Sequence, residues 1–163
     1  MKILKIVVLM ILVVSLSYSQ IIIPDKDRPT ELGREVFGLG GYVGLGTGMG
    51  LSFRHHLASV FSYQIAAGII KDSKTLLYDI GGELQFDLIR SENLRFYAGG
   101  GLGYYYKGKD SNELKGPLRI ALGIGAETKA KSAVHISGNL FFTYFTDGTI
   151  LPLPQVGLHY YFF

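Results

Sequence analysis

His135 and Ser137 are the two residues of this chain whose types and spacing best suit catalysis. Side chains two positions apart on an extended strand point to the same face, so the imidazole could act as a base for the serine hydroxyl. Such a pair would support ester or amide hydrolysis if a carboxylate oriented the histidine. No glutamate follows in the last segment of the chain. Because a short motif is weak evidence by itself, we expect no enzymatic activity and no catalytic residues.

Other candidate sites are weaker. His55 and His56 are adjacent, so on a strand they point to opposite faces and cannot hold one metal ion together. The glycine runs 38–41 and 99–103 neither open a helix nor precede the Lys-Ser/Thr of a phosphate loop. The absence of cysteine excludes disulfides, a thiol nucleophile and cysteine-ligated zinc. No arginine-rich stripe with spaced aromatics favours nucleic acid, so we expect no metal, no cofactor and no nucleic-acid partner.

Charged residues also occur inside segments of alternating polarity, on the less hydrophobic face. These are Arg54, Asp79, Glu83, Asp87, Arg95, Arg119 and Glu127. Bases and acids nearly balance, and because unpaired buried charge is costly, we expect them to satisfy one another in a polar network. We predict two groups, one of Arg54, Glu83, Asp79 and Arg119, the other of Arg95, Asp87 and Glu127. A gated pore or proton path is the alternative use of such a network.

The N-terminus predicts export. The chain has 163 residues with a formal charge of +3, and 48% of them are hydrophobic, which excludes a disordered chain. Residues 1–19 combine two lysines, an apolar run and small residues at the end, which is the layout of a cleavable signal peptide. Its two lysines leave with it, so the mature charge is only +1 and gives no reason to expect a polyanion as partner.

The mature chain reads as one all-β domain. Residues 20–34 carry two prolines and several charges and predict a short periplasmic leader, and the domain spans 35–163. Hydrophobic residues then alternate with period two in eight segments, separated by short turn sequences. The segments are 37–45, 51–56, 61–69, 76–88, 95–104, 118–127, 134–144 and 155–162. Short connections predict antiparallel neighbours, and an even strand number lets the last strand pair with the first, so we predict a closed eight-stranded up-and-down barrel.

The placement of charges and aromatics predicts which way this barrel faces. Every lysine after the signal peptide lies in the leader or the connections, and the second face of each strand mixes glycine, small polar and balanced charged residues. A membrane barrel has this arrangement, with its apolar face toward lipid and its polar face inward. Aromatic residues near strand ends suit the two membrane interfaces. These are Phe61, Tyr78, Tyr104, Tyr106, Tyr144, Tyr160 and Phe162.

With its signal peptide, eight alternating strands and aromatic ending His159–Phe163, the chain resembles the small OmpA/OmpX-like outer-membrane barrels of Gram-negative bacteria. The resemblance implies a place in the outer membrane, contact with its lipid, and insertion by the barrel-assembly machinery. It also implies that Tyr160, Phe162 and Phe163 form the insertion signal. The His-x-Ser pair is similar to the motif of outer-membrane lipid A deacylases, which are also eight-stranded barrels with a Ser/His/Glu site.

We therefore expect an integral outer-membrane protein with a largely packed lumen and a structural or surface-interaction role. An eight-stranded barrel is just wide enough for side chains to fill it, which favours this reading over transport. A narrow, porin-like channel for small solutes is the first alternative, and a lipid A-modifying enzyme using His135 and Ser137 is the second. If the first strand starts in the periplasm, the longest connection, 107–116, faces outside.

Overall fold

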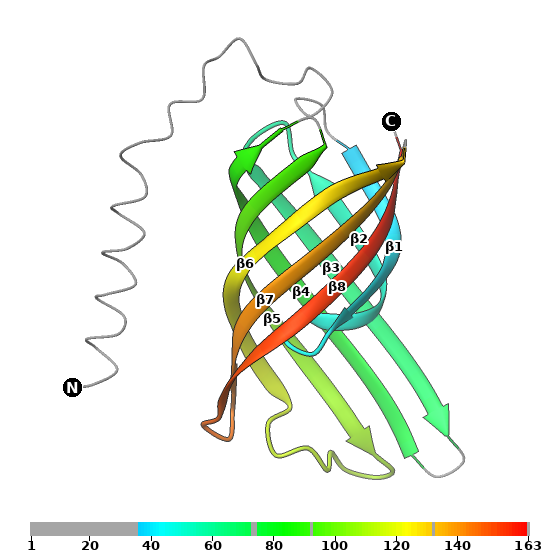
Figure 1. The fold of residues 1–163 in the computed structure, drawn as a ribbon. Coiled ribbons are helices and arrows are strands. Elements are labelled where there is room, and N and C mark those ends of the chain that lie inside the picture. Colours follow the sequence, from blue (N-terminus) through cyan, green and yellow to red (C-terminus); the bar gives the residue numbers. More distant parts are fainter. Residues whose placement is uncertain (1–35, 73–74, 92, 132, 163) are drawn as a thin grey trace, which may run out of the picture.

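The computed structural model describes residues 36–72, 75–91, 93–131 and 133–162, with the side chains of 129–131 left aside. These residues form eight strands and close into one antiparallel barrel (Figure 1). The strands are β1 (Val36–Gly44), β2 (Gly48–His56), β3 (Phe61–Asp72), β4 (Thr75–Arg90), β5 (Leu94–Gly108), β6 (Leu118–Lys131), β7 (Val134–Phe145) and β8 (Ile150–Phe162). Each strand pairs with its neighbour in sequence, and β1 pairs with β8. The predicted closed up-and-down barrel is confirmed.

The barrel has two distinct ends. The end at which β1 begins and β8 finishes is called here the terminal end, and the opposite end, with the β1–β2 turn and the long connection 109–117, the loop end. Figure 1 shows the start of β1 and the end of β8 at one end of the barrel, and the long connection at the other. No helix within the described ranges is both long and apolar enough to span a membrane. The predicted signal peptide and leader, residues 1–34, lie outside the described residues.

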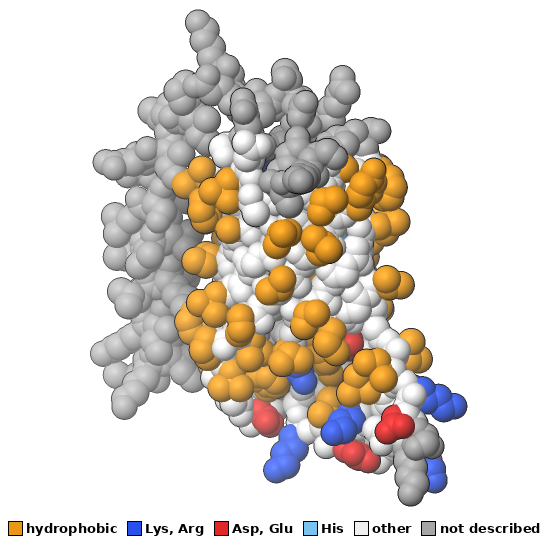
Figure 2. Space-filling model, turned by 45° about the vertical axis from the view of Figure 1, so that its right-hand side comes forward, with side chains coloured by type: hydrophobic (Ala, Val, Ile, Leu, Met, Phe, Trp, Pro, Cys, Tyr) orange, Lys and Arg blue, Asp and Glu red, His pale blue; other side chains and the backbone are white. Residues whose placement is uncertain are grey.

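The two faces of each strand separate as the alternation predicts. Odd-numbered residues of β3 such as Ile65 and Ile69 are exposed, whereas Ser62, Gln64 and Ala66 are buried. The same alternation recurs in β4 from Asp79 to Leu88 and in β8 from Gln155 to Phe162. Large apolar side chains therefore cover the outside of the wall, and polar and aromatic side chains fill the inside. Figure 2 shows hydrophobic side chains over the outer wall and the charged ones gathered at one end.

The last strand begins five residues earlier than the alternation predicts, at Ile150 instead of 155, and it includes Pro152 and Pro154. The carbonyl of Leu158 points toward Gly40 of β1. Since residues two apart in a strand direct their backbone groups to the same side, both prolines face that side as well. Pairing between β1 and β8 stops at Val43 and Val156. The prolines thus lie where β8 has no partner strand on that side, so the missing proline N–H breaks no hydrogen bond of the ladder.

Strand lengths around the barrel are uneven at the loop end. Strands β1 and β2 have 9 residues each, whereas β4 has 16 and β5 has 15. Pairing of β2 with β3 ends at Leu51 and Ala67, so the far part of β3 continues without β2. The β1–β2 hairpin is therefore the shortest part of the wall, and its turn lies within the height of the longer strands.

Candidate functional site

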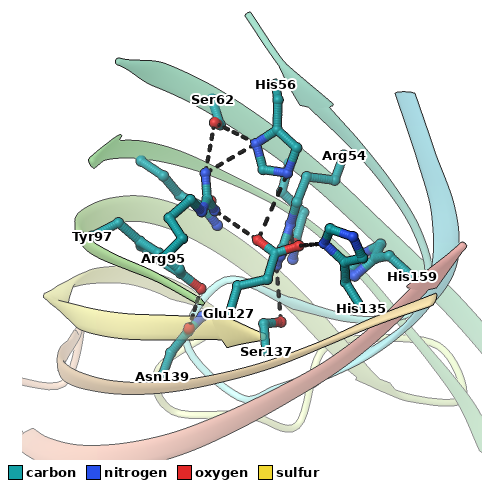
Figure 3. A network of polar contacts seen from close by, with 12 residues as sticks. Arg54, His56, Ser62, Arg95, Tyr97, Glu127, His135, Ser137, Asn139 and His159 are labelled. Atoms are coloured by element: carbon teal, nitrogen blue, oxygen red, sulfur yellow. Dashed lines mark hydrogen bonds and ion pairs between the residues drawn. The ribbon is translucent and has the colours of Figure 1, made fainter. Parts of the chain in front are cut away.

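The terminal half of the lumen contains a buried cluster of charges centred on Glu127 of β6 (Figure 3). The Arg54 Nη1 of β2 and the Arg95 Nη2 of β5 each lie 2.9 Å from Glu127 Oε2. Arg95 Nη1 also lies 3.0 Å from Asp87 Oδ1 of β4. Arg54 is 0% exposed. Arg90 of β4 pairs with the other oxygen of the Asp87 carboxylate. Three bases and two acids are thus paired where solvation by water is limited, which is the condition for tolerating buried charge.

Neutral donors and acceptors complete this cluster. Tyr161 OH donates to Glu127 Oε1 over 2.7 Å, and His135 Nδ1 lies 3.2 Å from the same oxygen. The His56 ring lies between Tyr161 OH and Ser62 Oγ, each 2.7 Å from one of its nitrogens. These residues were not part of the predicted network. Their positions on the inward face were visible in the alternation, but only the register brings them to one level of the barrel.

A second layer lies midway along the lumen around the hydroxyl of Tyr42. Asn139 Nδ2 donates to this hydroxyl over 2.8 Å, and Tyr42 OH reaches Gln155 Oε1 at 3.0 Å and Glu83 Oε2 at 3.1 Å. Thr47 Oγ1 donates within the same group, 2.8 Å from Gln155 Oε1. Five inward side chains from β1, β4, β7, β8 and the β1–β2 turn therefore close the lumen at this level.

The predicted grouping of Arg54 with Glu83, Asp79 and Arg119 is not formed. Gln64 is the register partner of both Arg54 and Glu83, and its side-chain oxygen accepts from Arg54 Nε at 2.8 Å. Gln64 thus separates Arg54 from Glu83, and the arginine turns to Glu127 instead. The other predicted group, Arg95 with Asp87 and Glu127, is brought together, with Arg54 added to it.

The other two members of the first group lie at the loop end and do not form an ion pair in the described structure. Tyr105 is the register partner of Asp79, and the Arg119 guanidinium stacks over the Tyr105 ring at 3.8 Å. Arg119 donates to the Leu45 carbonyl, and Asp79 Oδ1 accepts from Met49 N at 2.6 Å. Both charges therefore contact the backbone around the β1–β2 turn rather than each other.

His135 and Ser137 both face the lumen, but they do not form a catalytic arrangement. Ser137 Oγ accepts from Arg54 Nη2 at 3.1 Å, whereas His135 contacts Glu127. The carboxylate near the histidine is that of Glu127 on β6, whereas the last strand contributes no glutamate. Ser137 is 1% exposed. Its hydroxyl is held by a guanidinium and buried, so it has the environment of a structural residue.

The two adjacent histidines point to opposite faces of β2, as predicted. His55 stacks on the ring of Phe37 on the outer face, while His56 points into the lumen. Among the described residues no group of three or more potential ligands could hold a metal ion. The inward glycines give room for neighbouring chains: a Cβ on Gly125 would collide with the Tyr97 ring.

The predicted aromatic residues form two sets, one at each end of the wall. Phe61, Tyr160 and Phe162 lie near the terminal end, and Phe61 packs edge-on against Phe86. Tyr78, Tyr104, Tyr106 and Tyr144 lie near the loop end. Tyr78 stacks on Tyr106 with ring centroids 4.9 Å apart. Phe163, the last predicted residue of the insertion signal, lies outside the described residues.

Comparison with known proteins gives one solved structure with a loosely similar fold. No protein-family model and no curated protein matches the chain. The solved structure is the outer membrane protein Ail of Yersinia pestis, determined as a backbone in a phospholipid bilayer nanodisc. It shares 13% sequence identity with a TM-score of 0.46, over 78% of this chain and 98% of that one.

Proposed function

We propose that this chain is an integral outer-membrane barrel whose lumen is filled by its own side chains, with a structural or surface-interaction role and no enzymatic activity. The distribution of polarity across the wall carries the proposal. Leu51, Leu84 and Ile69 on the outside are 83%, 70% and 73% exposed. A soluble barrel has its charged face outward, whereas a barrel in lipid has its apolar face outward.

The spacing of the two aromatic sets supports a membrane of ordinary thickness. Tyr78 belongs to the loop-end set, and Phe86 is the register partner of Phe61 in the terminal set. Both lie on the outer face of β4, eight residues apart. A rise of about 3.3 Å per residue and a tilt of about 40° place them about 20 Å apart along the barrel axis. That agrees with an apolar band of about 25 Å flanked by aromatic girdles.

Export and insertion are further parts of this proposal. Residues 1–19 would direct the chain across the inner membrane, and 20–34 would remain as a periplasmic leader at the terminal end. Tyr160 and Phe162 on the outer face of β8, with Phe163 after them, would provide the signal that the barrel-assembly machinery reads. Outer-membrane lipid is then the partner of the whole outer wall.

The filled lumen is the reason for proposing a structural or surface role rather than transport. Side chains of β1, β2, β4, β5, β6, β7 and β8 meet across the barrel at two levels, the Glu127 cluster and the Tyr42 layer. A solute would have to break paired buried charges to pass, which is costly. The surface that remains for interaction is the loop end, with the connection 109–117.

The membrane assignment is tested by heat modifiability and fractionation. The full chain, expressed in a Gram-negative host, should co-sediment with outer membranes and run faster on a denaturing gel before boiling than after it. Release into the soluble periplasm without detergent would contradict the membrane assignment. In planar bilayers we expect no steady conductance, and reproducible charge-selective steps would contradict the filled lumen.

A further inference from the structure

The β1–β2 turn folds into the barrel instead of projecting from it. Gly46, Thr47 and Gly48 are buried, and Thr47 is 1% exposed. Its hydroxyl reaches Glu83 Oε2 on β4 at 3.2 Å and Gln155 Oε1 on β8 at 2.8 Å. Strand β2 also approaches β4 and β5, which are not its neighbours in the sheet. The turn therefore lies inside the lumen at the loop end.

Side chains from three other strands hold the turn by its backbone. Tyr105 OH of β5 accepts from Gly48 N at 2.9 Å and donates to the Gly44 carbonyl. Asp79 of β4 accepts from Met49 N, and Arg119 of β6 donates to the Leu45 carbonyl. Each contact binds a group that a turn on the surface would leave to water.

The wall opposite the turn is shaped to receive it. Gly81 of β4 and Gly103 of β5 face inward, and a Cβ on Gly81 would collide with the Thr47 carbonyl while one on Gly103 would collide with that of Gly46. Gly48 adopts a φ of 112°, a left-handed conformation that favours glycine and allows the chain to reverse in this space. Strands β1 and β2 pair with each other up to Gly44 and Gly48, but ladder pairing with β8 ends at Val43 and with β3 at Leu51, so this tip of the hairpin is held in the lumen by side chains.

The compartment around the turn has an acidic surplus. Asp79 and Glu83 face it and neither forms an ion pair among the described residues, while Arg119 is the one base recorded against the turn there. Three buried polar atoms beside the turn find no hydrogen-bond partner in the described structure: Asp79 Oδ2, Thr143 Oγ1 and Gln155 Nε2. The compartment therefore contains hydrogen-bonding groups that the turn leaves without a partner in the described structure.

We propose that the β1–β2 turn is an internal plug, and that its withdrawal opens an acidic compartment lined by Asp79 and Glu83 to water and small cations. Withdrawal takes Thr47 out of the Tyr42 layer, but Tyr42 still contacts Asn139, Gln155 and Glu83, and the Glu127 cluster lies beyond them. Cations are therefore admitted to the loop-end half of the lumen without a through-channel. The inference concerns the lumen alone and does not depend on where the barrel resides.

Thiol labelling tests this directly because the chain has no cysteine. Thr143→Cys places a thiol beside Gly46 at a site that is 0% exposed, and it removes no recorded hydrogen bond. The probes are 2-aminoethyl methanethiosulfonate, a cation, and 2-sulfonatoethyl methanethiosulfonate, an anion. The labelling rate of each probe at position 143 is divided by its rate at Ser111→Cys in the exposed loop. With the native turn, we expect the thiol at position 143 to be strongly protected.

Gly81→Ala is the variant designed to displace the plug, and Gly82→Ala is its matched control. A Cβ on Gly81 collides with the turn, whereas one on Gly82 faces outward with its nearest neighbour, the Gln64 carbonyl, at 3.6 Å. In the Thr143→Cys background, we expect Gly81→Ala to raise cation labelling about 5- to 30-fold, the effect of losing one or two buried hydrogen bonds. Gly82→Ala should leave the rate unchanged, and the anionic probe should gain much less.

Three results would overturn the proposal. The first is equal labelling of Gly81→Ala and Gly82→Ala in barrels that keep their gel shift. The second is equal acceleration by both probes, because the compartment would then not be acidic. The third is hydrogen exchange of the Gly48 and Met49 amides only on global unfolding of the unaltered protein, because the turn would then never leave the lumen.

If Gly81→Ala does not fold, Tyr105→Phe takes its place in the labelling experiment, and the amide exchange of the unaltered protein provides a second measurement.

Discussion

The two halves of the lumen accommodate their buried charged side chains in different ways. In the terminal half, charged side chains pair directly: Arg54 reaches across the lumen from β2 to Glu127 of β6, and Arg95 pairs with the same carboxylate from the neighbouring strand β5. In the loop-end half, Asp79 and Arg119 bind backbone groups around the turn. The first arrangement is a network in which each charge requires the others. The second is a piece of chain held by several separate hydrogen bonds, so the two halves should respond differently to mutation.

The largest expected effect is in the terminal half. Glu127→Gln removes the acid that both arginines share and leaves their charges buried with only Asp87, which also pairs with Arg90, to balance them. We expect a loss of unfolding free energy of about 3–5 kcal/mol, as for a broken buried ion pair. Urea unfolding of the barrel in lipid vesicles measures it. Glu113→Gln in the exposed connection is the control and should change little.

Tyr42→Phe tests the layer between the two halves. It removes a hydroxyl that accepts from Asn139 and that lies within reach of Gln155 and Glu83, so buried polar groups lose a partner. We expect a loss of about 1–3 kcal/mol in the same unfolding measurement. Tyr104→Phe, on the outer face, is the matched control. Equal effects of the two variants would mean that the layer contributes no more than a surface hydroxyl.

A smaller effect is expected for Arg119→Gln at the loop end. The variant loses the stacking on Tyr105 and the bond to the Leu45 carbonyl, but it leaves no buried acid that had been paired with it. We expect a loss of about 1 kcal/mol. A loss as large as that of Glu127→Gln would show that both ends depend on charge pairing, and the contrast between the halves would fail.

The smallest effect is outside the barrel wall, in the β7–β8 turn. The backbone N–H of Thr149 donates to Asp147 Oδ1 over 3.0 Å, and this bond lowers the pKa of the Asp147 carboxyl from its ordinary value. Because the pKa is lower in the folded state, the contribution to stability is present above the ordinary pKa and is lost as the pH falls through the lowered one. Asp147→Asn should reduce this acid dependence slightly. An NMR titration in which Asp147 keeps an ordinary pKa would contradict the assignment.

Much of the fold could be predicted from the sequence because a strand has a period of two. Alternation at positions such as 76–88 fixes which side chains share a face, and short connections fix which strands are neighbours. The inward set of seven charged residues and the outward aromatic sets follow from these two rules alone. The pattern predicts too late a start for β8 because Pro152 and Pro154 lie there, and proline is unfavourable in a strand unless the strand has a free edge.

Alternation and short connections thus specify the two faces, the strand order and the closed barrel. Which inward residues meet is set by the tertiary structure. Contact inside the lumen depends on the register of neighbouring strands and on the stagger around the whole barrel, and the alternation leaves both open by steps of two residues. The register of β2, β3 and β4 places Gln64 between Arg54 and Glu83, and that of β4 and β5 places Tyr105 beside Asp79, where Arg119 stacks on its ring. The tertiary structure also folds the β1–β2 turn inward, because only the closed wall offers that turn its glycine-lined space and its polar partners.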